Sequence, residues 1–199
     1  MPGAVGPNRM KRSEINSLLR AAEACFREHH WALPPRPRWD VTDFGLGDWR
    51  RHGLVLVNLA NEVEYCEKLM YARAGMVTPC HCHHRKKEDI VCRCGELVVR
   101  AWPSLPAECE GRVFPLLVNG ETREVTAGTP IRLGAGERVT LPPRVYHEFV
   151  PSSDECVMGE VSTANDDEHD NFFVDPNVGR FPQVLEDEPP VARLVSDRG

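Results

Sequence analysis

A short run of metal-ligand side chains stands out in the first half of the chain, at residues 80–88. Side chains two residues apart on a β-strand point to the same face, so His81 and His83 can bind one ion together. Glu88 has the opposite parity to His83, and we therefore expect the strand to end or bend between these two residues. The carboxylate of Glu88 can then join the two imidazoles.

A third histidine comes much later in the chain. His147 follows an apolar segment that ends in the two prolines Pro142 and Pro143. Three imidazoles and one carboxylate suit a labile first-row divalent metal better than a closed structural zinc site. The sequence therefore predicts one metal site with four ligands: His81, His83, Glu88 and His147.

The eight cysteines offer a second way to bind a metal. The pairs Cys80, Cys82 and Cys92, Cys94 supply four thiols, but structural zinc sites usually have two or more residues between paired cysteines. Cys80 and Cys82 should face away from His81, and we expect them to fill the wall behind the metal site as small apolar side chains.

Many short apolar segments, separated by glycine and proline, must position these ligands. They indicate strands near residues 53–59, 64–73, 96–102, 113–118, 128–133, 138–143 and 156–162, with a hairpin turn at Asn119-Gly120. An amphipathic pattern predicts a helix over residues 14–29, with Ser13 as its N-cap. The fold expected is mainly β, a sandwich or barrel preceded by one helix.

A chain of 199 residues is consistent with one domain. We expect residues 1–9 to be a disordered extension and residues 10–38 to form the N-terminal helix and a proline-rich connector. Residues 39–199 would form the barrel, with a C-terminal acidic loop and tail. That tail, from residue 165 onward, lacks a periodic pattern and is typical of a solvated loop.

Charge and hydropathy limit the partners. The formal net charge of −6 gives no basic footprint for nucleic acid, so none is expected as a partner. No apolar stretch approaches the roughly 18 residues of a membrane span, and no secretory signal opens the sequence. We expect a cytoplasmic protein with reduced thiols and no membrane contact.

The spacing of the ligands resembles the two sequence motifs of the cupin superfamily. The fixed positions of the first motif are filled by Gly75, His81, His83, Glu88 and Gly95. The second motif is matched in part, by Gly136, Pro142 and His147, with Arg144 where glycine is usual. The resemblance implies a cupin β-barrel, also called a double-stranded β-helix or jelly roll.

The chain further resembles the D-lyxose isomerase family within the cupins. The segments that carry this resemblance are residues 10–16, 39–45, 52–54, 66–68, 78–90, 141–147, 159–162, 165–171 and 186–189. The resemblance implies an aldose–ketose isomerase acting on D-lyxose and D-xylulose, with D-mannose and D-fructose as a further candidate pair. It also implies Mn²⁺ as cofactor, with Co²⁺, Ni²⁺, Fe²⁺ or Zn²⁺ suiting the same ligands, and a homodimer.

The chemistry agrees with this resemblance. Four ligands leave up to two positions on an octahedral ion, enough for adjacent oxygens of an open-chain sugar. A nearby base can then move a proton through an enediol, and a hydride shift stays open as an alternative. The proposed catalytic residues are Lys86 as a donor and Glu160 as the base, and the substrate-binding candidates are Asp166, Asp167, Arg180 and His84.

Two other functions fit the same ligands. Three histidines and a glutamate also occur in iron-dependent cupin dioxygenases, which would consume oxygen. A non-catalytic, metal-stiffened sugar-binding or sensor cupin would show no turnover and would tolerate changes at Lys86 and Glu160.

Overall fold

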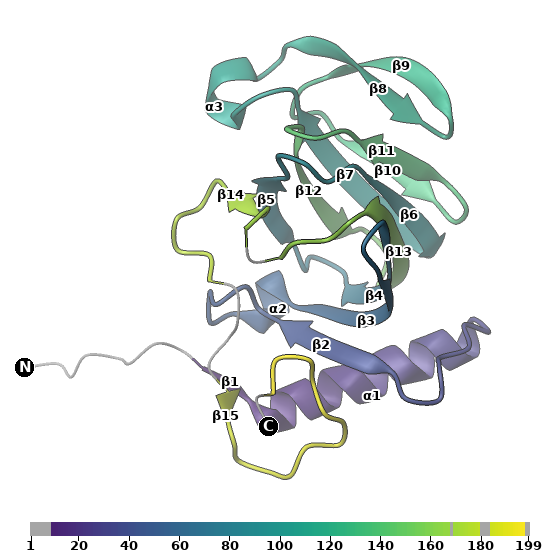
Figure 1. The fold of residues 1–199 in the computed structure, drawn as a ribbon, viewed down its shortest axis with the longest axis vertical. Coiled ribbons are helices and arrows are strands. Elements are labelled where there is room, and N and C mark those ends of the chain that lie inside the picture. Colours follow the sequence, from purple (N-terminus) through teal and green to yellow (C-terminus); the bar gives the residue numbers. More distant parts are fainter. Residues whose placement is uncertain (1–8, 168, 180–183, 198–199) are drawn as a thin grey trace, which may run out of the picture.

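The computed structural model describes residues 9–167, 169–179 and 184–197 of the chain. Strands are the main regular structure of this part, and most of them form two sheets that pack as a sandwich with one long helix at its base (Figure 1). The sandwich confirms the predicted mainly-β fold with an N-terminal helix. The predicted extension at residues 1–9 lies outside the described residues, apart from its last residue.

The larger sheet has eight strands. In spatial order they are β2 (Arg38–Thr42), β3 (Leu54–Asn61), β4 (Tyr65–Arg73), β13 (Glu155–Thr163), β6 (Glu88–Cys94), β11 (Arg138–Leu141), β8 (Val113–Val118) and β9 (Glu121–Thr126). All neighbours are antiparallel. Side chains therefore alternate between the sandwich interior and the outer face.

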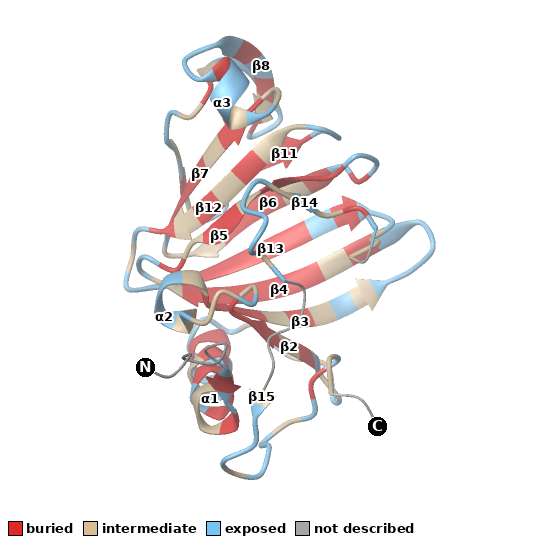
Figure 2. Ribbon diagram, turned by 90° about the vertical axis from the view of Figure 1, so that its left-hand side faces the viewer, coloured by how far each residue is buried: buried red, intermediate tan, exposed pale blue. Residues whose placement is uncertain are grey.

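The smaller sheet has five strands and is also antiparallel. Its spatial order is β10 (Ile131–Gly134), β7 (Glu96–Trp102), β12 (Tyr146–Pro151), β5 (Thr78–Cys82) and β14 (Phe172–Phe173). Leu97, Val99 and Phe149 are buried along its inner face. Figure 2 shows buried residues along the central strands and exposed residues in the connecting loops.

The long helix α1 (Arg12–Glu28) covers the outer face of the larger sheet at β2 and β3. Phe26 packs against Trp39, with ring centroids 6.2 Å apart, and edge-on against Tyr71 at 6.4 Å. Two further helices, α2 (Trp49–His52) and α3 (Pro106–Cys109), have one turn each and were not predicted. A four-residue helix is too short to leave a periodic pattern in the sequence.

The predicted N-cap of α1 was wrong. Ser13 lies inside the first turn, and its hydroxyl donates to Asp187 at 2.7 Å. The N-cap is Lys11, whose backbone N–H donates to Glu14 at 2.9 Å.

The acidic tail is largely exposed, as predicted, but it also forms specific strand and side-chain contacts that were not predicted. After β13 the chain returns to the smaller sheet as β14, and later forms β15 (Val184–Leu185), which pairs with β1 (Met10–Lys11). We call residues 184–197 the C-terminal strap. Several of its polar groups bind α1, where buried Arg12 contacts Glu186 at 2.6 Å and Asp197 at 2.7 Å.

Two turns have backbone conformations that their sequences help to explain. Asn119 and Gly120 both have positive φ, 54° and 82°, and join β8 to β9 as the predicted hairpin. Arg144 also has positive φ, 70°, before β12. Glycine adopts this conformation at lower cost, which accounts physically for the glycine usual at this place in the cupin motif.

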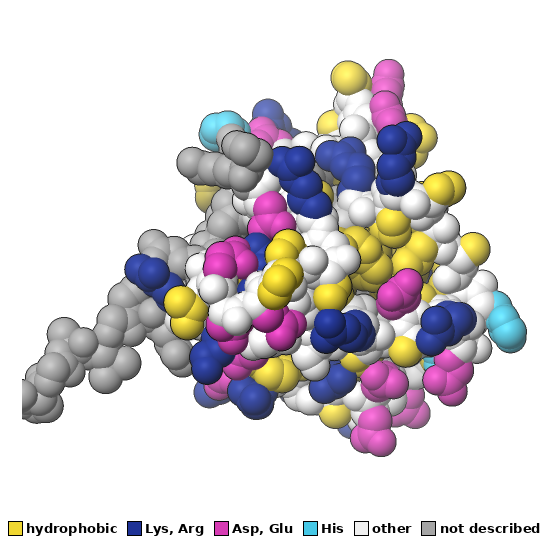
Figure 3. Space-filling model, turned by 90° about the horizontal axis from the view of Figure 1, so that it is seen from below, with side chains coloured by type: hydrophobic (Ala, Val, Ile, Leu, Met, Phe, Trp, Pro, Cys, Tyr) yellow, Lys and Arg dark blue, Asp and Glu magenta, His cyan; other side chains and the backbone are white. Residues whose placement is uncertain are grey.

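The surface has mixed charge. On the face shown in Figure 3, basic and acidic side chains lie interspersed with apolar ones. No helix in the described part of the chain is long and apolar enough to cross a membrane.

Candidate active site

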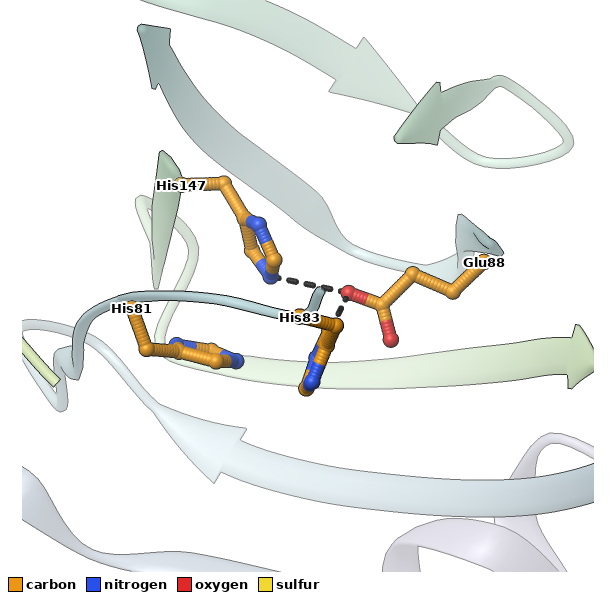
Figure 4. A group of neighbouring side chains, drawn as sticks. All are labelled: His81, His83, Glu88 and His147. Atoms are coloured by element: carbon orange, nitrogen blue, oxygen red, sulfur yellow. Dashed lines mark ion pairs between the residues drawn. The ribbon is translucent and has the colours of Figure 1, made fainter. Parts of the chain in front are cut away.

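The four predicted metal ligands come together inside the sandwich. His81, His83, Glu88 and His147 are all buried, and their ligand atoms lie within 4.8 Å of one another. Figure 4 shows the three imidazole rings converging on the carboxylate of Glu88. The Nε2 atom of His147 lies 2.8 Å from Glu88 Oε1, and that of His83 lies 3.5 Å from the same oxygen.

Strand pairing explains this convergence. His81 on β5 is the direct cross-strand partner of His147 on β12, so both side chains point into the sandwich from the smaller sheet. The chain then leaves β5 at Cys82, turns through residues 83–87, and enters the larger sheet at Glu88. The expected break between His83 and Glu88 is this crossing from one sheet to the other.

Each imidazole is oriented by a backbone carbonyl. The Nδ1 atoms of His81, His83 and His147 lie 2.8, 2.7 and 3.1 Å from the carbonyl oxygens of Pro79, Asp170 and Val145, respectively. A carbonyl oxygen only accepts hydrogen bonds, so each Nδ1 carries the proton and each Nε2 has a free electron pair. This is the second-sphere arrangement usual for histidines that bind metals.

The ligand set fits a divalent cation. Three buried atoms, His83 Nε2, His147 Nε2 and Glu88 Oε1, make no hydrogen bond within the described residues. Buried polar atoms without a partner are costly, and a cation among them would satisfy all three. Burial lowers the pKa of His81, helped by the nearby His147 and His83, so its ring stays neutral as a ligand must.

A row of buried charges continues from the metal ligands. The Lys86 ammonium group lies 2.7 Å from Glu88 Oε2 and 2.9 Å from Glu160 Oε1, and Lys68 lies 3.3 Å from that same Glu160 oxygen. Burial alone would lower the pKa of Lys86, but the charges of Glu160 and Glu88 outweigh it and raise the pKa. Burial would raise the pKa of Glu160, but Lys68 and Lys86 lower it, so this carboxyl is ionised at neutral pH.

Strand register puts Glu160 beside the metal ligands. Ser162 on β13 is the cross-strand partner of Glu88, and Glu160, two residues earlier, points to the same side of the sheet. On its other edge β13 pairs Glu160 directly with Lys68 of β4. Lys68 is therefore a member of the site, although it was not among the residues predicted from the sequence.

A pocket adjoins this row of charges. It has a volume of about 370 Å³ and extends over β2 and β3, and both Lys68 and Phe173 line it. The Phe173 ring packs against His81, with centroids 5.1 Å apart. The lining of the pocket includes both polar and apolar side chains. The polar ones include Asp40, Thr42, Asn58, Asn61, Asp167 and Asn171, and the apolar ones include Phe44, Leu54, Leu56 and Phe173.

The four substrate-binding candidates lie in different places. Asp167 lines the pocket, 3.8 Å from Lys68. Asp166 pairs with the exposed side chain of Arg85 at 2.8 Å, outside this pocket. The exposed ring of His84 stacks on Phe172, with centroids 3.7 Å apart, and Arg180 lies outside the described residues.

Asp170 is a further residue of the site that was not predicted from the sequence. Its side chain is 4% exposed and accepts hydrogen bonds from the backbone N–H groups of residues 84–86. It stands in an acidic run with Asp166 and Asp167, and no difference in residue type separates it from them. Only the fold shows that this aspartate is buried.

The cysteines are not assembled into a metal site. All eight are free thiols. Within the described residues, the three histidines and Glu88 are the only group of three or more potential ligands close enough to share an ion.

Fold and site together define the class: a cupin with one buried site of three histidines and one glutamate. The D-lyxose isomerase family model matches residues 36–198. The chain is 36% identical to the D-lyxose/D-mannose isomerase of Escherichia coli O157:H7, over 94% of this chain and 96% of that protein. It is 33% identical to the enzyme of the same name from Serratia proteamaculans, over 91% and 94% of the two chains. The chain belongs to the D-lyxose isomerase family.

Solved structures agree on the fold. The L-ribose isomerase of Cellulomonas parahominis, determined with L-ribose, superimposes with a TM-score of 0.66 at 21% identity. The superposition covers 90% of this chain and 100% of that one.

Proposed function

We propose that this protein is a metal-dependent aldose–ketose isomerase that interconverts D-lyxose and D-xylulose, and also D-mannose and D-fructose. The observation that carries the proposal is the continuous arrangement of three features. A buried group of three histidines and one glutamate is followed by the paired charges of Lys86 and Glu160, and then by a pocket lined in part by polar side chains. The relatives named above support the choice of sugars.

A divalent cation bound to the four ligands supplies Lewis acidity, which polarises the sugar carbonyl and acidifies the neighbouring C–H bond. The side chains of this protein would move the protons. Glu160 takes the proton from C2 of the open-chain aldose and returns it to C1, while the hydroxyl proton of O2 passes to O1. Both lysines bind Oε1 of Glu160, so we assign the proton transfer to Oε2.

Lys86 lies between the two carboxylates and keeps its charge, so it is suited to stabilise the negative oxygen of an enediolate. A hydride shift would need no carboxylate base, and the buried, ionised Glu160 favours the enediol route. We place the distal hydroxyls of the sugar in the pocket, near Asp167, Asp40 and Asn58. The roles of Asp166, His84 and Arg180 stay predictions.

The test is turnover of D-lyxose and D-mannose by metal-stripped protein before and after adding Mn²⁺. We expect metal-dependent formation of D-xylulose and D-fructose, and none from His81→Ala. If the metal-loaded protein forms neither ketose, the isomerase proposal fails. Oxygen uptake by the Fe²⁺-loaded protein would then favour a dioxygenase. Sugar binding without turnover would favour a sensor.

We further propose Mn²⁺ as the resident ion, a homodimer and a cytoplasmic location. Mixed nitrogen and oxygen ligands suit Mn²⁺, and eight free thiols suit a reducing compartment. Tyr65 and Val161 are about half exposed on the outer face of the larger sheet, at 50% and 43%, and supply apolar surface for a partner. Metal analysis of the purified protein and sedimentation velocity test the first two proposals, and fractionation of the source cells tests the third.

A further inference from the structure

The loop of residues 83–87 has to be held in place for the site to exist. It carries the ligand His83 and the ammonium group of Lys86, and it leads directly into the ligand Glu88. No regular strand or helix includes these five residues. Their backbone N–H groups therefore need partners outside the usual ladders.

Asp170 supplies most of those partners from a distant part of the chain. Its Oδ1 accepts from the N–H groups of His84 at 2.9 Å and Arg85 at 3.2 Å. Its Oδ2 accepts from Lys86 N–H at 2.9 Å and again from Arg85 at 3.2 Å. One carboxylate thus binds three consecutive N–H groups of the loop.

The backbone of the same residue orients a metal ligand. Its carbonyl oxygen lies 2.7 Å from His83 Nδ1, which leaves Nε2 of that ring facing Glu88. On the other side of the loop, the His83 carbonyl accepts a hydrogen bond from Arg144 N–H at 2.6 Å. His83 is therefore fixed both by its ring and by its backbone.

We propose that Asp170 is the positioning residue of this site. It sets the approach of His83 to the metal and of Lys86 to Glu88 and Glu160, without touching the substrate itself. The metal-binding part of this inference stands apart from the proposed reaction, and only its effect on turnover rests on that function.

The Asp170→Asn variant tests the inference because it keeps the shape of the side chain. Asparagine has one acceptor oxygen, so its NH₂ group would face N–H donors of the loop and leave at least one unpaired. The matched control is Asp175→Asn, the same change at an exposed position of the same segment. Asp175 caps only its own turn, through Asn177.

The first measurement is the affinity of each metal-stripped protein for Co²⁺, followed by the visible spectrum of the bound ion. We expect Asp170→Asn to bind Co²⁺ about 10–100-fold more weakly, as is typical when a second-sphere partner is lost. Its spectrum should also change, because the loop between the ligands His83 and Glu88 loses part of its hydrogen bonding and shifts. Asp175→Asn should match the unmodified protein within twofold in affinity and have the same spectrum.

The second measurement needs no variant. Hydrogen exchange of metal-free, unmodified protein should show the amides of residues 84–86 protected, since their partner is within the protein. This result would still test the inference if Asp170→Asn did not fold.

Two results would overturn the inference. One is Co²⁺ binding by Asp170→Asn with unchanged affinity and spectrum, and the other is unprotected exchange at residues 84–86. Neither readout involves a sugar, so failure of the isomerase proposal would be seen separately, as bound metal without turnover.

Discussion

Glu160 is the residue on which the proposed proton transfer depends most directly. Two ammonium groups bind one of its oxygens and lower its pKa, so the carboxylate is charged but surrounded by protein. A buried carboxylate keeps its charge only with such partners. Burying the charged Glu160 carboxylate costs folding free energy, and buried groups with perturbed pKa values cluster at functional sites.

Glu160→Gln should abolish most turnover while leaving the metal bound. The amide keeps the size of the side chain but cannot accept the substrate proton, and loss of a general base typically lowers kcat by about 10²–10⁴-fold. The measurement is kcat with metal occupancy determined in parallel. Glu148→Gln is the control, because Glu148 pairs with Arg100 on the other sheet, and its activity should be unchanged. Full turnover by Glu160→Gln would mean that another residue is the catalytic base.

At the residue scale, the sequence predicted what depends on short spacing. His81, His83 and Glu88 lie within eight positions, and their pattern predicts a shared ion before any fold is known. Asp170 and Lys68 could not be found in this way. Lys68 reaches the site through the pairing of β4 with β13, and Asp170 reaches it because the chain after β13 comes back to the loop of residues 83–87. Neither residue has a distinctive spacing of its own.

The C-terminal strap is the element whose role differs most from expectation. Its acidic residues are exposed but paired, since Arg12 and Ser13 of α1 bind Glu186 and Asp187. The bond from Arg12 lowers the pKa of Glu186, and the bond from the Ser13 hydroxyl lowers the pKa of Asp187. Strands such as β7 and β8 were predicted to the residue because apolar runs bounded by turns define them, whereas the strap pairs through specific polar contacts that no periodicity reveals.

These shifts predict that the strap loosens in acid. A carboxyl group whose pKa is lowered by folding stabilises the folded state fully at pH values above its ordinary pKa, which is 4.5 for Glu186 and 3.8 for Asp187. This stabilisation is lost as the pH falls through the pKa of the group in the folded state. We expect strong protection of the Val195 amide, which bonds to the Trp39 carbonyl, at pH 6, and weaker protection at pH 3.

Hydrogen exchange corrected for its intrinsic pH dependence measures this change. Arg12→Met is the matched variant and should show the weaker protection already at pH 6. Equal protection factors at both pH values in the unmodified protein would mean that the ionised carboxylates of the strap do not hold it in place.

At the scale of the whole molecule, the metal site joins the two sheets. His81 and His147 belong to the smaller sheet and Glu88 to the larger one, so an ion bound to all of them crosslinks the sandwich. Binding to the folded state alone stabilises it by about 2.7 kcal/mol at a metal concentration 100 times the Kd.

For a chain of this length, that stabilisation corresponds to a rise in Tm of about 5–10 °C. Thermal unfolding with and without Mn²⁺ measures it, and His81→Ala should show a much smaller rise. A metal that binds stoichiometrically without raising Tm would mean that the unfolded chain binds the ion equally well, and so that binding does not need the site assembled from both sheets.

The dependence of the loop 83–87 on Asp170 has a consequence for how the protein is made. Chains fold progressively as they leave the ribosome, starting from their N-terminal end. The first metal ligands are synthesised about halfway through the chain, but the residue that fixes their loop follows more than 80 positions later. We therefore expect the nascent chain to complete this site only when nearly the whole domain has emerged, and we expect metal to be inserted at the last stage of biosynthesis.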